Sequence, residues 1–381
     1  MFQFVQIYFH GKPLGVMARD AVTHTAQFEF YPEFLQKGWG ISPILFPMEK
    51  IRNQPKILTF ENTGGLPPFL MDTLPGAYAR DLLGYALQGT QQTPEKLSSQ
   101  SYLSLLGNRG MGAFSFEPSG YPELNAVETV DFDMLVRYAR QLYDGSALRL
   151  SDRRLRELLR SGLFTRGSWP KALIAINDFT GEVMSGQGAV PEGFDGWIIK
   201  LDGVRAESQK VLGLEYEYYK KALDCGIAMA PCRTLRDGHK VHLLCKRFDR
   251  LGSEKIHVQS FASLREVSED SYEEVFRCMR QLRLSGPEME QMFRRVVFNV
   301  LVGNCNDTAR KVDFTFSPQE GLWRLAPAYN LRPTPDKTNH ALSVGGKWKD
   351  ITKENLLELG RMLHIRQAKV IVAKCTEVLG K

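Results

Sequence analysis

The chain has few cysteines, and their spacing indicates neither a zinc site nor a disulfide framework. It has only six, all after position 224, and no two of them form a Cys-x-x-Cys pair. Zinc sites use closely spaced ligand pairs, and disulfide frameworks are typical of small secreted domains. We therefore expect reduced, mostly buried thiols in a cytoplasmic protein.

Long apolar runs and a strong excess of one charge are also absent. No apolar stretch approaches the roughly 18 residues that span a bilayer, and the N-terminal MFQFVQIYFHGKPLG lacks a signal-peptide layout, so we expect no membrane partner. The formal net charge of +6 permits contact with a nucleotide or nucleic acid but argues for neither. With 43% hydrophobic and 24% charged residues and no internal repeats, the chain is expected to form two or three domains or lobes.

Short periodic segments predict a mixture of strands and helices. Val5, Ile7 and Phe9 alternate before a His-Gly-Lys-Pro turn, which predicts a hairpin opening a small β-rich domain. Further strands are predicted over 28–31, 172–176 and 196–200, and helices over 77–87, 132–143 and 152–159. The basic stretch 149–166 interleaves arginines with leucines. It fits an amphipathic helix with a solvated cationic face, and a phosphate-binding role is the alternative.

The most informative stretch is 296–331, VVFNVLVGNCNDTARKVDFTFSPQEGLWRLAPAYNL. An apolar run leads into the polar loop Asn304–Lys311, a short strand-like run follows, and a second apolar approach ends on Asn330. A loop of convergent polar groups, a hairpin and a second polar ligand are how kinases hold a hydroxyl and Mg²⁺ near the γ-phosphate. The two positions where carboxylates are expected read Asn306 and Asn330.

These residues resemble the HipA-like kinases, bacterial protein-kinase-fold proteins usually encoded as toxins beside a DNA-binding antitoxin. That family carries F-N-x-L-x-G-N-x-D-D-H-x-K-N and then W-x-L-A-P-A-Y-D-L. The first motif matches at Phe298, Asn299, Leu301, Gly303 and Asn304, and the second at seven of its positions between Trp323 and Leu331. By this resemblance Asn306 stands where the family has its catalytic-base Asp, and the next Asp is kept as Asp307. Four further positions differ from the family: Thr308 replaces His, Arg310 replaces Lys, Lys311 replaces a metal-binding Asn, and Asn330 replaces a metal-binding Asp.

The resemblance continues on the nucleotide side. The family's G-G-A-R-P-K-A stretch matches Gly167 and Pro170-Lys171-Ala172, but its first glycine is Arg166. Lys200 ends an apolar strand and matches the family's strand lysine, which pairs with nucleotide phosphates.

Four further residues complete the predicted nucleotide side. Glu215 is the expected ion-pair partner of the strand lysine, and Glu217 is its competitor. Arg247-Phe248-Asp249 lies in a match to the family's R-F-D-R, where the chain passes the adenine pocket. A structural ion pair between Arg247 and Asp249 is an equal alternative.

The first third of the chain resembles the HipA-like N-terminal subdomain. The shared features are Ala18–Asp20, an LPxxxxxTLP-like run at Leu66–Pro75, and the glycine-dense stretch 107–113. No Lys-Ser or Lys-Thr follows the glycines, so we interpret that stretch as a structural turn and not as a phosphate loop.

The substitutions remove the chemistry that a kinase needs. The neutral amide of Asn306 cannot accept a hydroxyl proton, and Asn330 offers Mg²⁺ one neutral carbonyl where it prefers an anionic oxygen. Lys311 places a cation where the metal would lie. An alternative remains open, in which the loop slips by one residue and Asp307 and Asp313 supply a base and a metal ligand.

We therefore predict an α+β fold in which a bilobal protein-kinase-like domain follows a β-rich HipA-like N-terminal subdomain. The predicted domains are 1–125, 126–250 and 251–381. The predicted function is that of a pseudokinase that binds a small DNA-binding antitoxin-like or other regulatory protein and reaches DNA only indirectly. ATP binding is expected to be weak and Mg²⁺ binding is doubtful. The alternative is an active ATP-dependent serine/threonine protein kinase toxin.

Overall fold

The computed structural model describes residues 4–19, 26–53, 57–60, 65–87, 93–120, 122–145, 162, 166–188, 190–265 and 270–381. The predicted cationic helix over 152–159 and Asp20 of the N-terminal resemblance lie outside these residues. The chain divides into two compact units: unit 1 consists of Met1–Trp39, Met48–Leu212 and Arg233–His257, and unit 2 of Gly40–Pro47, Gly213–Cys232 and Val258–Lys381. The division into three domains at 125 and 250 stays a prediction.

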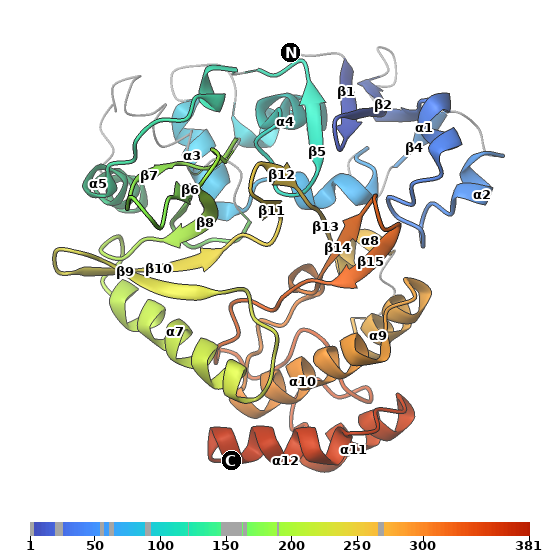
Figure 1. Ribbon diagram of the computed structural model, residues 1–381, viewed down its shortest axis with the longest axis vertical. Coiled ribbons are helices and arrows are strands. Elements are labelled where there is room, and N and C mark those ends of the chain that lie inside the picture. The colour runs from blue at the N-terminus through green and yellow to red at the C-terminus, as the bar shows by residue number, and fades with distance from the viewer. Residues whose placement is uncertain are drawn as a thin grey trace. The chain divides into compact units, whose positions relative to one another are not determined.

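The first sheet of unit 1 confirms the predicted N-terminal hairpin. Its strand order is β4-β3-β2-β1-β5, and all its neighbours are antiparallel (Figure 1). Val5, Ile7 and Phe9 alternate along β1 and are buried, because successive side chains of a strand point to opposite faces. The strands are β1 Phe4–Phe9, β2 Lys12–Arg19, β3 Ala26–Phe30, β4 Ile57–Thr59 and β5 Phe114–Glu117.

Unit 1 also contains short helices, and the one over 132–143 has the bounds predicted from its periodicity. Asp131 caps that helix by accepting a hydrogen bond from Met134 N. The helical elements are α1 Pro32–Lys37, α2 Met48–Ile51, η2 Pro68–Thr73, α3 Ala77–Ala86, η3 Pro94–Lys96, α4 Ser99–Leu106, η4 Pro122–Asn125 and α5 Phe132–Tyr143.

A second sheet of unit 1 has the order β7-β6-β8-β10-β9. The whole of β6 is buried, and its sequence is apolar without interruption from Ala172 to Ile176. The strands are β6 Lys171–Ile176, β7 Val183–Ser185, β8 Asp195–Lys200, β9 Cys232–Asp237 and β10 Lys240–Lys246, followed by the small hairpin β11 Arg250–Leu251 and β12 Glu254–Lys255. Helix α7, Ser208–Asp224, starts in unit 1 and ends in unit 2.

The glycine-dense stretch 107–113 is a turn that serves the packing of unit 1. The Arg250 guanidinium donates to the carbonyls of Gly110 and Gly112, and Lys255 Nζ donates to the carbonyls of Asn108 and Phe114. Burial, together with the neighbouring arginines, lowers the pKa of Lys255 to about 7. Carbonyl oxygens that hold cations repel phosphate, so these contacts support the interpretation as a structural turn.

Unit 2 is mainly helical around a three-stranded sheet of order β13-β14-β15. Ser285 and Glu288 form a capping box at the start of α10, and the helix ends at Gly303, whose φ of 69° is the left-handed conformation that glycine adopts freely. The strands are β13 His257–Ser260, β14 Asp313–Ser317 and β15 Leu322–Leu325, and the helices are α8 Phe261–Leu264, α9 Tyr272–Gln281, α10 Gly286–Val302, η5 Ala309–Lys311, α11 Lys353–Met362 and α12 Ala368–Leu379.

In the part of the chain that the structure describes, no helix is both long enough and apolar enough to cross a bilayer.

Candidate functional site

The loop that resembles the catalytic segment starts directly after α10 and is pinned to the end of that helix. Asn304 N donates to the carbonyl of Asn299 at 2.9 Å, and Asn304 Nδ2 donates to Asn299 Oδ1 at 2.9 Å. Both side chains are buried. The loop therefore leaves the helix in one defined direction and continues through η5 into β14.

Asp307, the aspartate kept in this loop, is a buried structural acceptor. Its Oδ2 accepts a hydrogen bond from the Tyr272 hydroxyl at 2.7 Å and lies 2.9 Å from His340 Nδ1, and its Oδ1 accepts from Ala341 N at 2.8 Å. Only 4% of the residue is exposed. Burial, with the nearby Asp307 charge, raises the pKa of Tyr272 well above its ordinary value, so the hydroxyl stays a donor. Both carboxylate oxygens are thus engaged.

Asp313, the proposed substitute metal ligand, lies in a second buried cluster. It begins β14, is 1% exposed, and its Oδ2 accepts from the Tyr329 hydroxyl at 2.7 Å. Arg295 donates to the carbonyl of Ala326 at 2.6 Å. Burial lowers the pKa of Arg295 to about 10, and the charges of Asp313 and Tyr329 partly offset that shift. The charge of the Asp313 carboxylate therefore favours the protonated form of a buried guanidinium.

The altered positions lie in unit 2 but have different surroundings. Asn306 and Asn330 are half-buried, and Asn330 has a φ of 54°, a left-handed conformation that asparagine tolerates better than most residues. Thr308 precedes η5, and its carbonyl accepts from Lys311 N at 2.9 Å. Arg310 is exposed. Among the described residues, no group of three or more His, Cys, Asp or Glu is arranged to hold a metal ion.

The two candidate phosphate-binding lysines lie opposite each other in unit 1. Lys171 on β6 pairs in register with Lys200 on β8. Lys171 Nζ donates to the carbonyl of Arg166 at 2.5 Å, and the Arg166 guanidinium lies 3.6 Å from the Asp72 carboxylate. Arg166, which replaces the family's first glycine, therefore contacts Lys171 through its backbone carbonyl and Asp72 through its side chain. Gly167 follows it at a φ of 87°.

Glu215 and Glu217, the two candidate partners of Lys200, differ in burial and contacts. Glu215 is 5% exposed on α7. Glu217 is exposed and pairs with Lys221 at 2.7 Å, one helical turn away. This favours Glu215 over its competitor, and its pairing with Lys200 stays a prediction.

Arg247 and Asp249 form the structural ion pair that the sequence left as one of two alternatives. The guanidinium donates to both carboxylate oxygens at 2.9 and 2.8 Å, and Arg250 and Gly112 N add contacts at 2.7 and 3.0 Å. Burial alone would raise the pKa of Asp249, but the charges of Arg247 and Arg250 outweigh it and hold the pKa well below its usual range. Phe248, which separates Arg247 from Asp249 in the sequence, is half-buried.

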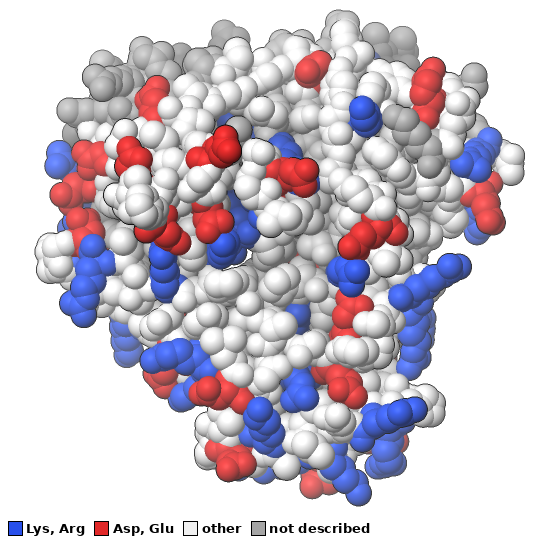
Figure 2. Space-filling view, in the orientation of Figure 1, with Lys and Arg blue, Asp and Glu red and all other residues white. Residues whose placement is uncertain are grey.

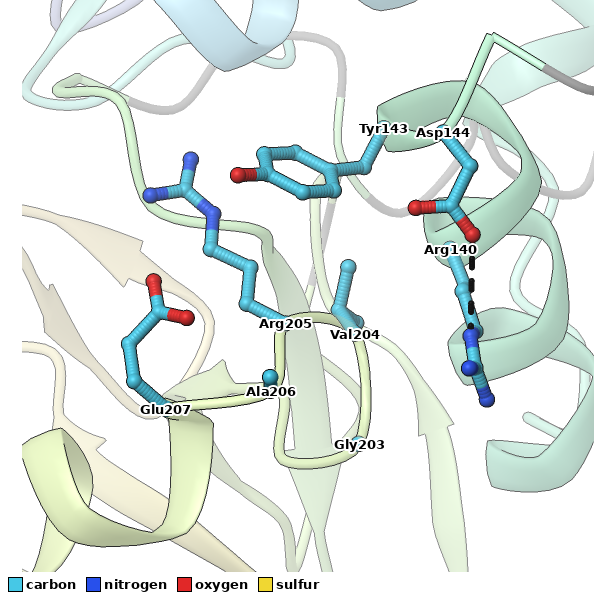
Figure 3. Close-up of a pocket in the computed structure, with 8 residues that line it drawn as sticks. All are labelled: Arg140, Tyr143, Asp144, Gly203, Val204, Arg205, Ala206 and Glu207. Carbon is cyan, nitrogen blue, oxygen red and sulfur yellow. Dashed lines mark ion pairs between the residues drawn. The ribbon is translucent and has the colours of Figure 1, made fainter.

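A pocket of about 470 Å³ in unit 1 had no counterpart in the sequence motifs. The Arg205 guanidinium lies 4.6 Å from the Tyr143 ring and 5.0 Å from the Trp169 ring. Figure 3 shows Arg205 and Tyr143 beside each other, and Arg140 paired with Asp144 at 3.7 Å. The lining residues are Arg140, Tyr143, Asp144, Gly203, Val204, Arg205, Ala206 and Glu207. Two arginines and two acids balance, so the lining charge favours no ligand class.

Comparison with known protein families identifies the family of this chain. The model of the HipA-like C-terminal domain matches residues 164–380, and that of the HipA N-terminal domain matches residues 5–117. The chain belongs to the HipA-like family. The predicted resemblance is thereby confirmed, from the N-terminal hairpin to α12. No curated protein matches the chain in sequence.

The solved structure of a HipA protein confirms the α+β fold. The HipA of Shewanella oneidensis MR-1, solved in a toxin–antitoxin complex with HipB and operator DNA, is 16% identical with a TM-score of 0.67 over 98% of this chain and 88% of that chain. The Helicobacter pylori proinflammatory kinase CtkA is 11% identical with a TM-score of 0.35 over 50% of this chain and 89% of that chain. At such identities the likeness to HipA concerns the fold alone.

Replacing Asp249 tests whether the R-F-D-R stretch serves stability. Asp249→Asn leaves Arg247 and Arg250 buried without their carboxylate, so we expect a loss of about 3–5 kcal/mol in the free energy of unfolding. Asp195→Asn is the matched control, because Asp195 pairs with Lys246 at 2.7 Å near the surface, and its loss should be below about 1 kcal/mol. Urea unfolding followed by circular dichroism measures both. Equal small losses would contradict the structural role.

Proposed function

We propose that this HipA-like protein has impaired phosphoryl transfer and acts by binding a small regulatory protein. The proposal rests on the burial and hydrogen bonding of the two aspartates, Asp307 and Asp313, that lie near the altered positions. Asp307 and Asp313 are both buried, and both accept short hydrogen bonds from tyrosine hydroxyls. We infer that neither serves as a substitute for the acids replaced by Asn306 and Asn330.

Magnitudes argue against the slipped loop that would rescue catalysis. Freeing Asp307 gives up contacts with Tyr272, His340 and Ala341 N, and hydrogen bonds to a charged group contribute about 1.5–3 kcal/mol each. A general base supplies a factor of about 10²–10⁴, equivalent to about 3–5 kcal/mol. The free energy lost by breaking the three hydrogen bonds of Asp307 is therefore at least as large as the lowering of the reaction barrier that a general base would provide.

The donor set of unit 2 does not fit Mg²⁺. A magnesium ion prefers anionic oxygens in near-octahedral geometry. Asn306 and Asn330 are neutral, Lys311 is a cation, and Asp313 already serves Tyr329. Any ATP would then be held by fixed cations such as Lys200. We infer weak binding that changes little with Mg²⁺.

The proposed partner is a small DNA-binding, antitoxin-like protein. The HipA of Shewanella oneidensis, which has the same fold, was solved with HipB and operator DNA. In this chain Lys, Arg, Asp and Glu are interspersed over the face shown in Figure 2, and the net charge is only +6. A DNA-reading surface is usually a basic stripe, so we assign DNA contact to the partner.

The retained N-terminal residues do not by themselves identify the partner surface. Gly110 and Gly112 hold Arg250, and Ala113 accepts a hydrogen bond from His10 N. These contacts serve the packing of unit 1. The partner proposal therefore depends on family membership and on the likeness to HipA.

Nucleotide binding tests the first part of the proposal. In calorimetric titration of the full-length protein, Mg²⁺ should change the Kd for ATP by less than threefold. Lys200→Ala should abolish the binding that remains, because the triphosphate loses a fixed cation. Lys246→Ala is the control. Lys246 pairs in register with Trp197, which is three residues before Lys200 on β8, so its side chain lies on the sheet face opposite to that of Lys200. A tenfold tightening of ATP binding by Mg²⁺ would count against the proposal.

Restoring the acids tests the second part. The combined changes Asn306→Asp, Lys311→Asn and Asn330→Asp should create Mg²⁺-dependent transfer of the ATP γ-phosphate that the unaltered protein lacks. Radiolabel transfer with Mg²⁺, with Mn²⁺ and without metal measures it. Transfer by the unaltered protein that is lost in a folded Asp307→Asn variant would support the active kinase.

Recovery of a complex tests the third part. Full-length tagged protein purified from its native host should bring down a small DNA-binding protein in a fixed ratio, measured by light scattering and mass spectrometry. The triply restored variant is the control and should keep the partner, because binding does not depend on phosphoryl transfer. Recovery of the protein only as a monomer would contradict the proposal.

A further inference from the structure

The small hairpin of β11 and β12 brings two cations to the glycine-dense turn of unit 1. Arg250 and Lys255 pair in register across this hairpin. Arg250 Nη2 donates to the carbonyl of Gly110 at 2.9 Å. Lys255 Nζ donates to the carbonyl of Phe114, the first residue of β5, at 3.4 Å and to that of Asn108 (Figure 1). Residues directly opposite each other on paired strands are close neighbours, so two like charges are held near one another.

Positive charge exceeds negative charge around Lys255. Asp249 pairs with Arg250 at 2.7 Å and with Arg247 at 2.8 Å. Among the residues that the structure describes, it is the only carboxylate in contact with Arg247, Arg250 or Lys255. Arg109 in the same turn is fully buried and adds a further positive charge that acts on Lys255. At least three cations therefore share one carboxylate, and a second anion would improve this balance.

Two buried nitrogen atoms near Lys255 have no hydrogen-bond partner in the described part of the chain. One is Nε of Arg250, because the hydrogen bonds of that guanidinium come from its two terminal nitrogens. The other is Nε2 of His10, whose backbone N donates to the carbonyl of Ala113, next to Phe114. Burial, with the charge of Lys255, lowers the pKa of His10 to about 4, so its ring is neutral and can carry the proton on Nε2. Both atoms can donate to an anion.

The amine of Lys255 combines access to solvent with nucleophilic character. The residue is half-buried, and the preceding hairpin residues 251–254 are exposed. Burial of the amine, together with the charges of Arg250 and Arg247, lowers its pKa to about 7. An ordinary lysine has a pKa of about 10.4 and is almost entirely protonated at neutral pH. Only a neutral amine has a lone pair that can attack an electrophile, so Lys255 differs from the surface lysines.

We propose that Lys255 is a site at which carbon dioxide binds covalently as a carbamate. The amine nitrogen attacks the carbon of CO₂, an N–C bond forms, and one C–O π bond becomes a lone pair on a carboxylate oxygen. The nitrogen releases one proton to solvent, and no atom is oxidised or reduced. The side chain thereby changes from an amine into an anion, and removal of CO₂ reverses the reaction.

The surroundings of Lys255 stabilise the product of this reaction. The carbamate keeps one N–H, which still donates to a carbonyl of the turn, and its carboxylate is an acceptor for Nε of Arg250 and Nε2 of His10. It also supplies the second anion that the cations of the cluster lack. Transfer of a neutral acyl group would remove the lysine charge without supplying an anion. The cluster therefore favours CO₂ over acyl donors.

Carbamate formation would make the attachment of the hairpin to the turn depend on CO₂. Arg250 already joins the two segments through Asp249 and Gly110, and the carbamate would add a charged contact at the same place. The residues involved all belong to unit 1. This inference does not depend on the proposed pseudokinase role, because the altered positions of unit 2 take no part in it.

Chemical trapping of the carbamate tests the proposal. Full-length protein at neutral pH is equilibrated with carbon-13-labelled bicarbonate and CO₂, treated with triethyloxonium ion to convert carbamates into stable ethyl esters, and mapped by peptide mass spectrometry. We expect at least about tenfold more label on Lys255 than on Lys246, because the neutral fraction of an ordinary lysine is far smaller. Lys255→Gln should abolish the label at this position. Lys246→Gln is the matched control and should leave it unchanged, because Lys246 pairs with Asp195 near the surface.

The unaltered protein decides the outcome even if a variant fails to fold. The α-amine of the purified protein is the internal control, because α-amines have a pKa of about 8 and also form carbamates. Label on the α-amine without label on Lys255 would overturn the proposal. Equal label on Lys255 and on the exposed lysines would overturn it as well, because the cluster would then give the site no selectivity.

Discussion

The buried carboxylate of Asp307 holds the loop on which the candidate site of unit 2 depends. Its donors come from α9, through Tyr272, and from the segment that carries His340 and Ala341. Tyr272 in turn accepts from Asn299 on α10. One charge therefore joins the loop to three separate parts of unit 2. Removing it would leave several buried donors without an acceptor, which costs far more than losing a surface contact.

Unit 1 is organised around a comparable buried charge. Asp249 accepts from Arg247, Arg250 and Gly112 N, and thereby ties the end of β10 to the glycine-dense turn. In both units the family residues that this chain keeps have an internal structural task. Asn306 and Asn330, which stand where the family carries acids, are half-buried, so a neutral amide at these positions removes no buried charge partner. This difference explains how the fold persists while the catalytic acids do not.

A function carried by binding is consistent with this distribution of kept and changed residues. A protein that binds a partner needs a stable fold and a surface, and neither requires a general base or a metal ion.

Local patterns determined which elements form. The alternation of Val5, Ile7 and Phe9 predicted the first hairpin, and the periodicity of 132–143 predicted α5, because both depend on neighbours along the chain. Motif matches likewise identified the family, and they predict that Asn306 and Asn330 stand where the family carries acids.

Only the tertiary structure decided what the surviving charged residues do. In the sequence, Asp307 was a candidate base and Arg247 with Asp249 had two equal interpretations. Their partners Tyr272, His340 and Gly112 come from segments distant along the chain, which local periodicity does not specify. A hydrogen bond forms between neighbours in space, and the packing of helices and strands determines which residues those are.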